Sequence, residues 1–273
     1  MGRIDVRGLG LVFPLTGAGA PSSGDDAALP GANGDPRLVR GPRGRVVGVR
    51  ALGGIDFCLR SGDRLGLVGR NGSGKTTLLH VLAGIYPPDE GRVEIEGRVT
   101  SLLNINLGVQ LNASGHRNVT LRGLAAGRSR AEIEAKRAEI AAFAGLGEFM
   151  DLPMSSYSAG MRMRLTFAIA TAFTPDILLL DEWISAGDKG FQASAADRMN
   201  AFAAKAGIMV LASHSAALIE RTCNQVLWLD RGHVRLHGPP DEVLAAFAEA
   251  TGAKRARRRS REKRGGARRP SAA

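Results

Sequence analysis

The sequence predicts an α/β fold built around a mostly parallel central sheet. Two short stretches, 177–180 and 208–212, are wholly apolar, which is typical of parallel strands buried on both faces. Helices are predicted shortly before them, over 161–173 and 191–204. Buried apolar strands that alternate with helices indicate a sheet covered by helices, so this pattern determines the predicted fold class.

Shorter patterns predict the other elements. Ile133, Ile140 and Phe143 lie on one side of a predicted amphipathic helix over 130–144, and a further helix is predicted over 76–85. Short apolar or alternating runs bounded by turn residues predict strands over 1–14, 55–60, 64–68, 93–96, 99–103, 226–229 and 234–236. The last two strands form a predicted hairpin.

Composition divides the 273 residues into one folded domain and a tail. The domain covers 1–250 and contains a segment, 15–45, whose Gly, Ala, Pro and Asp content predicts a flexible insertion. The Arg-rich segment 251–273 is predicted to be disordered. The longest apolar run, 243–248, is far shorter than the roughly 20 residues that span a membrane, and the N-terminus lacks the apolar region of a secretory signal. We therefore expect a cytoplasmic protein that is not itself embedded in a membrane.

The net charge of +11 is concentrated in the tail. Residues 254–269 contain ten Lys or Arg and one Glu, a net charge of +9, which leaves +2 for the rest of the chain. This distribution argues against a nucleic-acid partner. The tail is either a solvated end or a segment that contacts anionic lipids.

A glycine-rich stretch lies between the predicted strand 64–68 and the predicted helix 76–85. Its residues match the pattern G-x-x-x-x-G-K-[ST] and are Gly69, Arg70, Asn71, Gly72, Ser73, Gly74, Lys75, Thr76 and Thr77. The glycines allow backbone N–H groups to turn toward a phosphate, and the N-terminus of the following helix favours an anion. Lys75 adds a cation at the β- and γ-phosphates, and the Thr76 hydroxyl can bind Mg²⁺. This stretch predicts ATP and Mg²⁺ as cofactors.

Polar residues that follow the two apolar strands complete the predicted site. Asp181 ends the strand 177–180, where its carboxylate can reach the Mg²⁺. Glu182 comes next and is the candidate general base for the attacking water. His214 follows the strand 208–212 at the edge of the same site, where it can sense or stabilise the γ-phosphate.

A second anion-binding motif precedes the Asp181 strand. Ser158 and Gly160 begin the predicted helix and offer a hydroxyl, backbone N–H groups and a helix N-terminus. The stretch Tyr157-Ser158-Ala159-Gly160-Met161 resembles the signature of ABC-type ATPases, which usually reads L-S-G-G-Q. The form Y-S-x-G-M-[RK]-x-R-L, together with Asp181-Glu182-Trp183-Ile184-Ser185-Ala186-Gly187-Asp188 and Gly115-His116-Arg117-Asn118-Val119, resembles ATPases that export capsule, O-antigen or teichoic acid.

The resemblance covers roughly 46–250 and implies a P-loop ABC ATPase with an antiparallel β subdomain and a helical subdomain. It implies a head-to-tail homodimer in which Ser158 and Gly160 of one copy meet the γ-phosphate held by the other, with Asp188 contacting the partner copy. An integral membrane permease and a lipid-linked polysaccharide cargo are implied, and the chain would sit at the cytoplasmic face of the membrane. The alternatives are an ABC transporter for a small solute and a soluble ABC ATPase acting on ribosomes or DNA.

Three assignments stay open at this point. Most ABC ATPases place a glutamine after the strand 99–103, and Asn104 is the first candidate for that role and Gln110 the second. Phe13 is either the aromatic that stacks on adenine or a core residue. The insertion 15–45 separates Phe13 from the next strand, and either folds over the adenine site or forms a simple loop.

Overall fold

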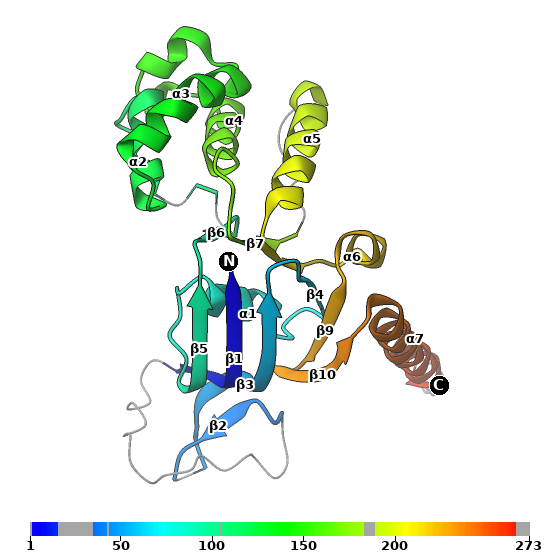
Figure 1. The fold of residues 1–273 in the computed structure, drawn as a ribbon. Helices are drawn as coiled ribbons and strands as arrows, with labels where there is room; N and C mark the ends of the chain where they lie inside the picture. The colour runs from blue at the N-terminus through cyan, green and yellow to red at the C-terminus, as the bar shows by residue number, and fades with distance from the viewer. Residues whose placement is uncertain are drawn as a thin grey trace, which may run out of the picture.

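The computed structural model confirms the α/β fold (Figure 1). It describes residues 2–15, 35–42, 44–103, 105–106, 108–182 and 189–265, and it describes the side chains of these residues except at 189, 190 and 253–265. Within these residues no helix is long and apolar enough to cross a membrane.

A six-stranded sheet forms the centre of the molecule, in the order β10-β9-β4-β8-β7-β6. Neighbouring strands in this order are parallel, except that β10 runs antiparallel to β9. The bounds are β4 Arg64–Val68, β6 Val99–Ser101, β7 Ile177–Asp181, β8 Ile208–Ala212, β9 Gln225–Asp230 and β10 His233–Gly238. Successive side chains of β7 pack into different buried clusters. Leu179 belongs to one cluster, whereas Leu178 and Leu180 belong to another.

A four-stranded antiparallel sheet, in the order β2-β3-β1-β5, lies beside the central sheet (Figure 1). Its strands are β1 Arg3–Pro14, β2 Leu38–Arg40, β3 Val46–Arg60 and β5 Glu90–Glu96. Helix α1, Lys75–Leu82, packs into the cluster that joins the two sheets, together with side chains of β1, β3, β4, β7 and β8. This packing fixes the start of α1 at the carboxyl end of β4.

A helical subdomain stands apart from both sheets (Figure 1). It contains α2 Gly115–Ala125, α3 Arg130–Ala144, the 3-10 turns η1 Gly147–Asp151 and η2 Met154–Ser156, and α4 Ala159–Ala170. Its own core includes Val119, Ile133, Ile140 and Leu165, so it is a separately packed unit. The other helices, α5 Lys189–Lys205, α6 Ala216–Thr222 and α7 Pro240–Gly265, contribute Met199, Ile219 and Val243 to the cluster on the second face of the central sheet.

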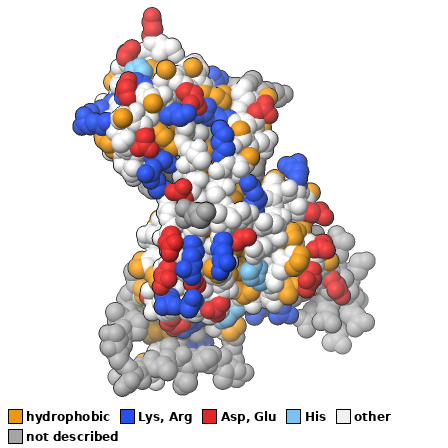
Figure 2. Space-filling model, viewed as in Figure 1, with side chains coloured by type: hydrophobic (Ala, Val, Ile, Leu, Met, Phe, Trp, Pro, Cys, Tyr) orange, Lys and Arg blue, Asp and Glu red, His pale blue; other side chains and the backbone are white. Residues whose placement is uncertain are grey.

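Acidic and basic side chains are interspersed on the face of the molecule shown in Figure 2, over both the helical subdomain and the sheets. On β1, for example, Asp5 accepts hydrogen bonds from Arg3 at 2.7 Å and from Arg7 at 2.9 Å. On this face, side chains of opposite charge therefore lie close to one another.

Strand β2 lies inside the segment 15–45, where residues 38–40 pair with β3. The backbone of 251–265 continues α7 as a helix. Helices α2, α6 and α7 had no clear apolar periodicity and were not predicted.

Candidate functional site

The glycine-rich loop connects β4 to α1, and glycine is required at several of its positions. Gly72 and Gly74 have φ angles of +74° and +107°, which favour glycine. A Cβ at Gly74 would meet Leu52 Cδ2 at 2.9 Å, and one at Gly69 would clash with the Leu229 carbonyl and the Ser73 hydroxyl. The backbone at Gly69 and Gly74 thus lies too close to its neighbours for a side chain at either position.

Two polar side chains of the loop are buried without a complete set of partners. The Lys75 ammonium donates to the carbonyls of Gly69 at 2.8 Å and Arg70 at 3.3 Å, and burial lowers the pKa of Lys75 while Asp181 and Glu182 oppose that shift. The Ser73 Oγ is buried and has no hydrogen-bond partner among the described residues. Buried cations and hydroxyls are normally satisfied, so these groups fit an incoming phosphate.

The Thr76 hydroxyl and the Asp181 carboxylate meet at the carboxyl end of β7, as the sequence predicts. Thr76 Oγ1 donates to Asp181 Oδ2 at 2.7 Å, across a separation of 105 residues. Mg²⁺ takes one or two protein oxygens together with phosphate oxygens and water. The Thr76 hydroxyl and the Asp181 carboxylate are oxygen ligands of this kind, so the pair fits a Mg²⁺ ion that takes its other ligands from phosphate or water.

Glu182 is held in an unusual backbone conformation beside β8. Its φ angle is +66°, which is strained for a residue with a side chain, and its N–H donates to the Ala212 carbonyl at 2.8 Å. The carboxylate accepts hydrogen bonds from Ser213 Oγ and from the His214 backbone N–H, both at 3.1 Å. The Nε2 atom of His214 lies 4.0 Å from Glu182 Oε1. The structure therefore brings together the predicted Glu182 and His214 and adds Ser213, for which a single serine gave no sequence signal.

Glu182 and His214 are accessible, with side chains 53% and 58% exposed. Asp181 pairs with Ala212 in the parallel register of β7 and β8, which places the two strand ends side by side. The Glu182 carboxylate is thus held by two hydrogen-bond donors, Ser213 Oγ and the His214 N–H, while it stays accessible to solvent.

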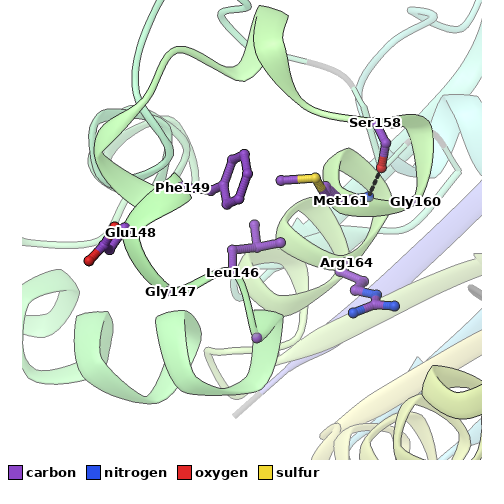
Figure 3. A pocket seen from close by; sticks show the side chains of 9 residues that line it. Leu146, Gly147, Glu148, Phe149, Ser158, Gly160, Met161 and Arg164 are labelled. Atoms are coloured by element: carbon purple, nitrogen blue, oxygen red, sulfur yellow. Dashed lines mark hydrogen bonds between the residues drawn. The ribbon is translucent and has the colours of Figure 1, made fainter.

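The second predicted anion site lies at the N-terminus of α4. The Ser158 Oγ accepts a hydrogen bond from the Met161 N–H at 3.2 Å, and Ala159 and Gly160 are exposed. A cavity of about 540 Å³ lies beside it, lined by Gly145, Leu146, Gly147, Glu148, Phe149, Ser158, Gly160, Met161 and Arg164. In Figure 3 the apolar side chains of Leu146, Phe149 and Met161 point toward one another next to the Ser158 cap.

Tyr157, predicted as a nucleotide contact, is buried inside the helical subdomain. Its side chain is only 3% exposed and its hydroxyl donates to the Phe149 carbonyl inside the helical subdomain. The ring instead supports the turn that precedes α4.

One chain alone does not bring the two anion sites together. The carboxyl end of α4 leads within a few residues to β7, so its N-terminus is the end remote from the central sheet (Figure 1). Twelve helical residues span about 18 Å. The Ser158 cap thus lies in the helical subdomain, whereas Lys75 lies at the start of α1 between the two sheets.

The remaining candidates are placed as follows. Phe13 is 39% exposed and packs edge-on against Tyr86 at 5.4 Å, so it is not a core residue. Asn104 and Asp188 lie outside the described residues. Gln110 is exposed, and its backbone is held by the buried Asn118, whose side chain bonds to the Gln110 N–H at 2.8 Å and carbonyl at 2.9 Å.

Residues 52–185 match the family model described as ABC transporter. An O-antigen export system ATP-binding protein of Yersinia enterocolitica is 44% identical over 194 residues, which cover 71% of this chain and 81% of that protein. The chain belongs to the ABC transporter ATP-binding protein family.

Other ABC relatives are longer than this chain. An O-antigen export system ATP-binding protein of Myxococcus xanthus is 43% identical over 74% of this chain and 46% of its own length. A teichoic acids export ATP-binding protein of Shouchella clausii is 40% identical over 73% of this chain and 55% of its own length. The chain thus spans about half the length of these two relatives.

Solved structures confirm the ABC ATPase fold. The ATP-binding subunit of an ABC transporter superposes with a TM-score of 0.64 at 20% identity, covering 90% of this chain and 93% of that one. A dimeric ATP-binding cassette in a post-hydrolysis state, bound to ADP and Pi, superposes with a TM-score of 0.60 at 17% identity, covering 87% and 98%. At these identities the likeness establishes the fold alone.

Proposed function

We propose that this chain binds MgATP and hydrolyses it as a head-to-tail dimer, and that hydrolysis drives export of a lipid-linked polysaccharide through a separate membrane permease. The observation that carries the proposal is the convergence of Thr76 and Asp181 with Glu182 and its partner His214 at the carboxyl ends of β7 and β8. We propose one ATPase domain over 1–250 for this activity.

The phosphate loop supplies the nucleotide contacts in this proposal. Backbone N–H groups of 69–77 face the phosphates, and Lys75 exchanges its loop carbonyls for phosphate oxygens. Thr76 and Asp181 hold the Mg²⁺. Mg²⁺ supplies neutralisation of the charge on the β- and γ-phosphates. Phe13, exposed on β1, offers its ring to the adenine.

Glu182 acts on the attacking water. Its carboxylate accepts the water proton, the water oxygen bonds to the γ-phosphorus, and the bond to the β–γ bridging oxygen breaks to leave ADP and phosphate. Ser213 orients the carboxylate through its hydrogen bond. His214 stabilises the charge on the transferring phosphoryl group from its position 4.0 Å from Glu182.

A second copy of the chain completes each site. The Ser158 hydroxyl and the exposed N-terminus of α4 at Ala159 and Gly160 form a cap that faces solvent in one chain, and a head-to-tail partner would bring it to the γ-phosphate. Asp188, outside the described residues, is proposed to contact that partner.

The permease and cargo are proposed from the relatives and from one surface. Relatives at about 40% identity are named for export of O-antigen and of teichoic acids. Within 104–125, the region proposed to contact the permease, Leu111 is 51% and Leu124 is 41% exposed. Either Asn104, outside the described residues, or Gln110 would link that contact to the metal.

The basic tail is proposed to hold the chain against anionic lipid at the membrane face. Its support is the net charge of +9 over 254–269. Each basic residue close to an anionic leaflet is worth about 1 kcal/mol.

The test is ATP hydrolysis by the chain purified with membrane proteins encoded beside it. Wild type should hydrolyse ATP, whereas Glu182→Gln should lose about 100-fold or more in kcat, because a general base contributes on the order of 10² to 10⁴. The variant should also accumulate as an ATP-bound dimer on gel filtration.

Glu220→Gln on the exposed side of α6 is the matched control and should keep wild-type kcat. A Glu182→Gln variant as active as wild type would remove Glu182 from its role as base. If a small solute stimulates the ATPase activity and lipid-linked polysaccharide does not, the transported substrate is a small solute and the proposed cargo is wrong.

A further inference from the structure

Residues 35–42, at the end of the insertion, contact the phosphate loop through one arginine. Arg37 Nη1 donates a hydrogen bond to the Gly72 carbonyl at 3.1 Å. Its Nε and Nη2 atoms donate to the Asp35 carboxylate at 3.0 and 2.7 Å. The guanidinium therefore bridges a carboxylate of its own segment and the backbone of the nucleotide site.

Rigid elements hold Arg37 in this position. Its carbonyl accepts a hydrogen bond from the Arg50 N–H at 2.7 Å, and the following residues, β2, pair with β3. Strand β3 in turn lies directly against the loop, since Ala51 and Leu52 would contact a Cβ placed at Gly74. The pairing of this segment with β3 therefore holds Arg37 next to the phosphate loop.

The bond to Gly72 controls a peptide unit of the phosphate cradle. A trans peptide is planar, so the Gly72 carbonyl and the Ser73 N–H point in opposite directions. The Ser73 N–H donates across the loop to the Arg70 carbonyl at 3.0 Å, while the Gly72 carbonyl accepts from Arg37. These two hydrogen bonds orient the peptide, because Gly72 has a φ angle of +74° and no side chain that could restrain it.

We propose that Arg37 is a positioning residue for nucleotide binding, which together with the Arg70 carbonyl orients the Gly72–Ser73 peptide of the phosphate loop and so links the insertion to nucleotide affinity. The inference rests on the proposed binding of MgATP at this loop. Asp35 supports Arg37 by fixing the plane of the guanidinium through two parallel hydrogen bonds. Because the backbone amides of such a loop surround the α- and β-phosphates, both ATP and ADP depend on this peptide.

The experiment compares Arg37→Ala with Arg40→Ala by titrating MgATP and MgADP into the full chain in a calorimeter and by steady-state hydrolysis. Arg40 ends β2, three residues after Arg37, and is the matched control, because its Nη1 bonds to the Gly44 carbonyl at 2.7 Å and not to the loop. We expect Arg37→Ala to raise Kd for both nucleotides and KM for ATP by about tenfold, the value of one charge-assisted hydrogen bond. Saturated kcat should stay within about twofold.

Arg37→Lys keeps the charge but loses the fork of donors, and should fall between wild type and Arg37→Ala. If Arg37→Ala fails to fold, as judged by its melting temperature, Asp35→Asn retains the arginine and should raise both Kd values by a smaller factor. Equal Kd values for Arg37→Ala and Arg40→Ala would overturn the inference. A wild-type chain that binds neither nucleotide would instead refute the proposed function.

Discussion

At the scale of single residues, the site depends on how Glu182 is held. Its backbone lies at φ +66°, and its carboxylate accepts hydrogen bonds from Ser213 Oγ and the His214 N–H. We expect Ser213→Ala to lower kcat by about tenfold, which corresponds to about 1.4 kcal/mol of lost transition-state stabilisation, with KM for ATP nearly unchanged. Steady-state kinetics over a range of ATP concentrations would measure both parameters.

Ser215→Ala is the appropriate comparison for this residue. The Ser215 hydroxyl accepts from the Leu218 N–H at the start of α6 and does not bond to Glu182. Its kcat should match wild type. A Ser213→Ala chain with unchanged kcat would show that the carboxylate is oriented without the Ser213 hydroxyl.

At the scale of elements, four of the described helices, α2, α3, α4 and α6, begin with a serine cap, but only one of these caps is proposed to touch a nucleotide. Ser158 caps α4 and Ser129 caps α3, where it forms a capping box with Glu132. Replacement of either serine by alanine should cost about 1 kcal/mol of unfolding free energy, the usual value of an N-cap. We expect only Ser158→Ala to reduce ATP hydrolysis as well, because α4 presents its N-terminus to the partner's γ-phosphate.

Urea unfolding and ATPase assays on both variants separate the two effects. Equal losses of activity in Ser158→Ala and Ser129→Ala would indicate that the helical subdomain acts through its stability alone. Such a result would remove the Ser158 cap from the proposed nucleotide contact.

At the scale of the whole molecule, the charge is divided between a nearly balanced fold and a basic end. Val243 is fully buried and Phe247 packs on Trp228 at 5.5 Å, so α7 is anchored well before the tail begins. We therefore expect deletion of 254–273 to leave the melting temperature and ATPase activity unchanged. Binding to vesicles that contain anionic lipid should fall at least tenfold, as measured by co-sedimentation.

Vesicles of neutral lipid provide the control for this deletion, and neither form of the chain should bind them. Salt near 1 M should also abolish binding of the full chain, since the screening length falls to about 3 Å. Unchanged binding of the shortened chain to anionic vesicles would remove the tail from the proposed membrane contact.

The amino-acid sequence by itself determined the phosphate loop, the buried strands and the fold class. These features are local: the loop needs glycines, a lysine and a threonine next to one strand and one helix, and the strands need only short apolar runs. The residue types of Asp181, Glu182, His214 and Ser158 were also visible, because motifs at fixed spacing mark them.

The tertiary structure alone decided how these residues are held and which neighbours hold them. Ser213 and Arg37 carry no sequence signal, since a lone serine after a strand and an arginine in a Gly- and Pro-rich segment are common. Their roles come from strand pairing, which places Ala212 beside Asp181 and the β2 segment beside β3 and the loop. Hydrogen bonds such as that from Arg37 to Gly72 join residues far apart in the chain, and only the register of the sheets brings their atoms within reach.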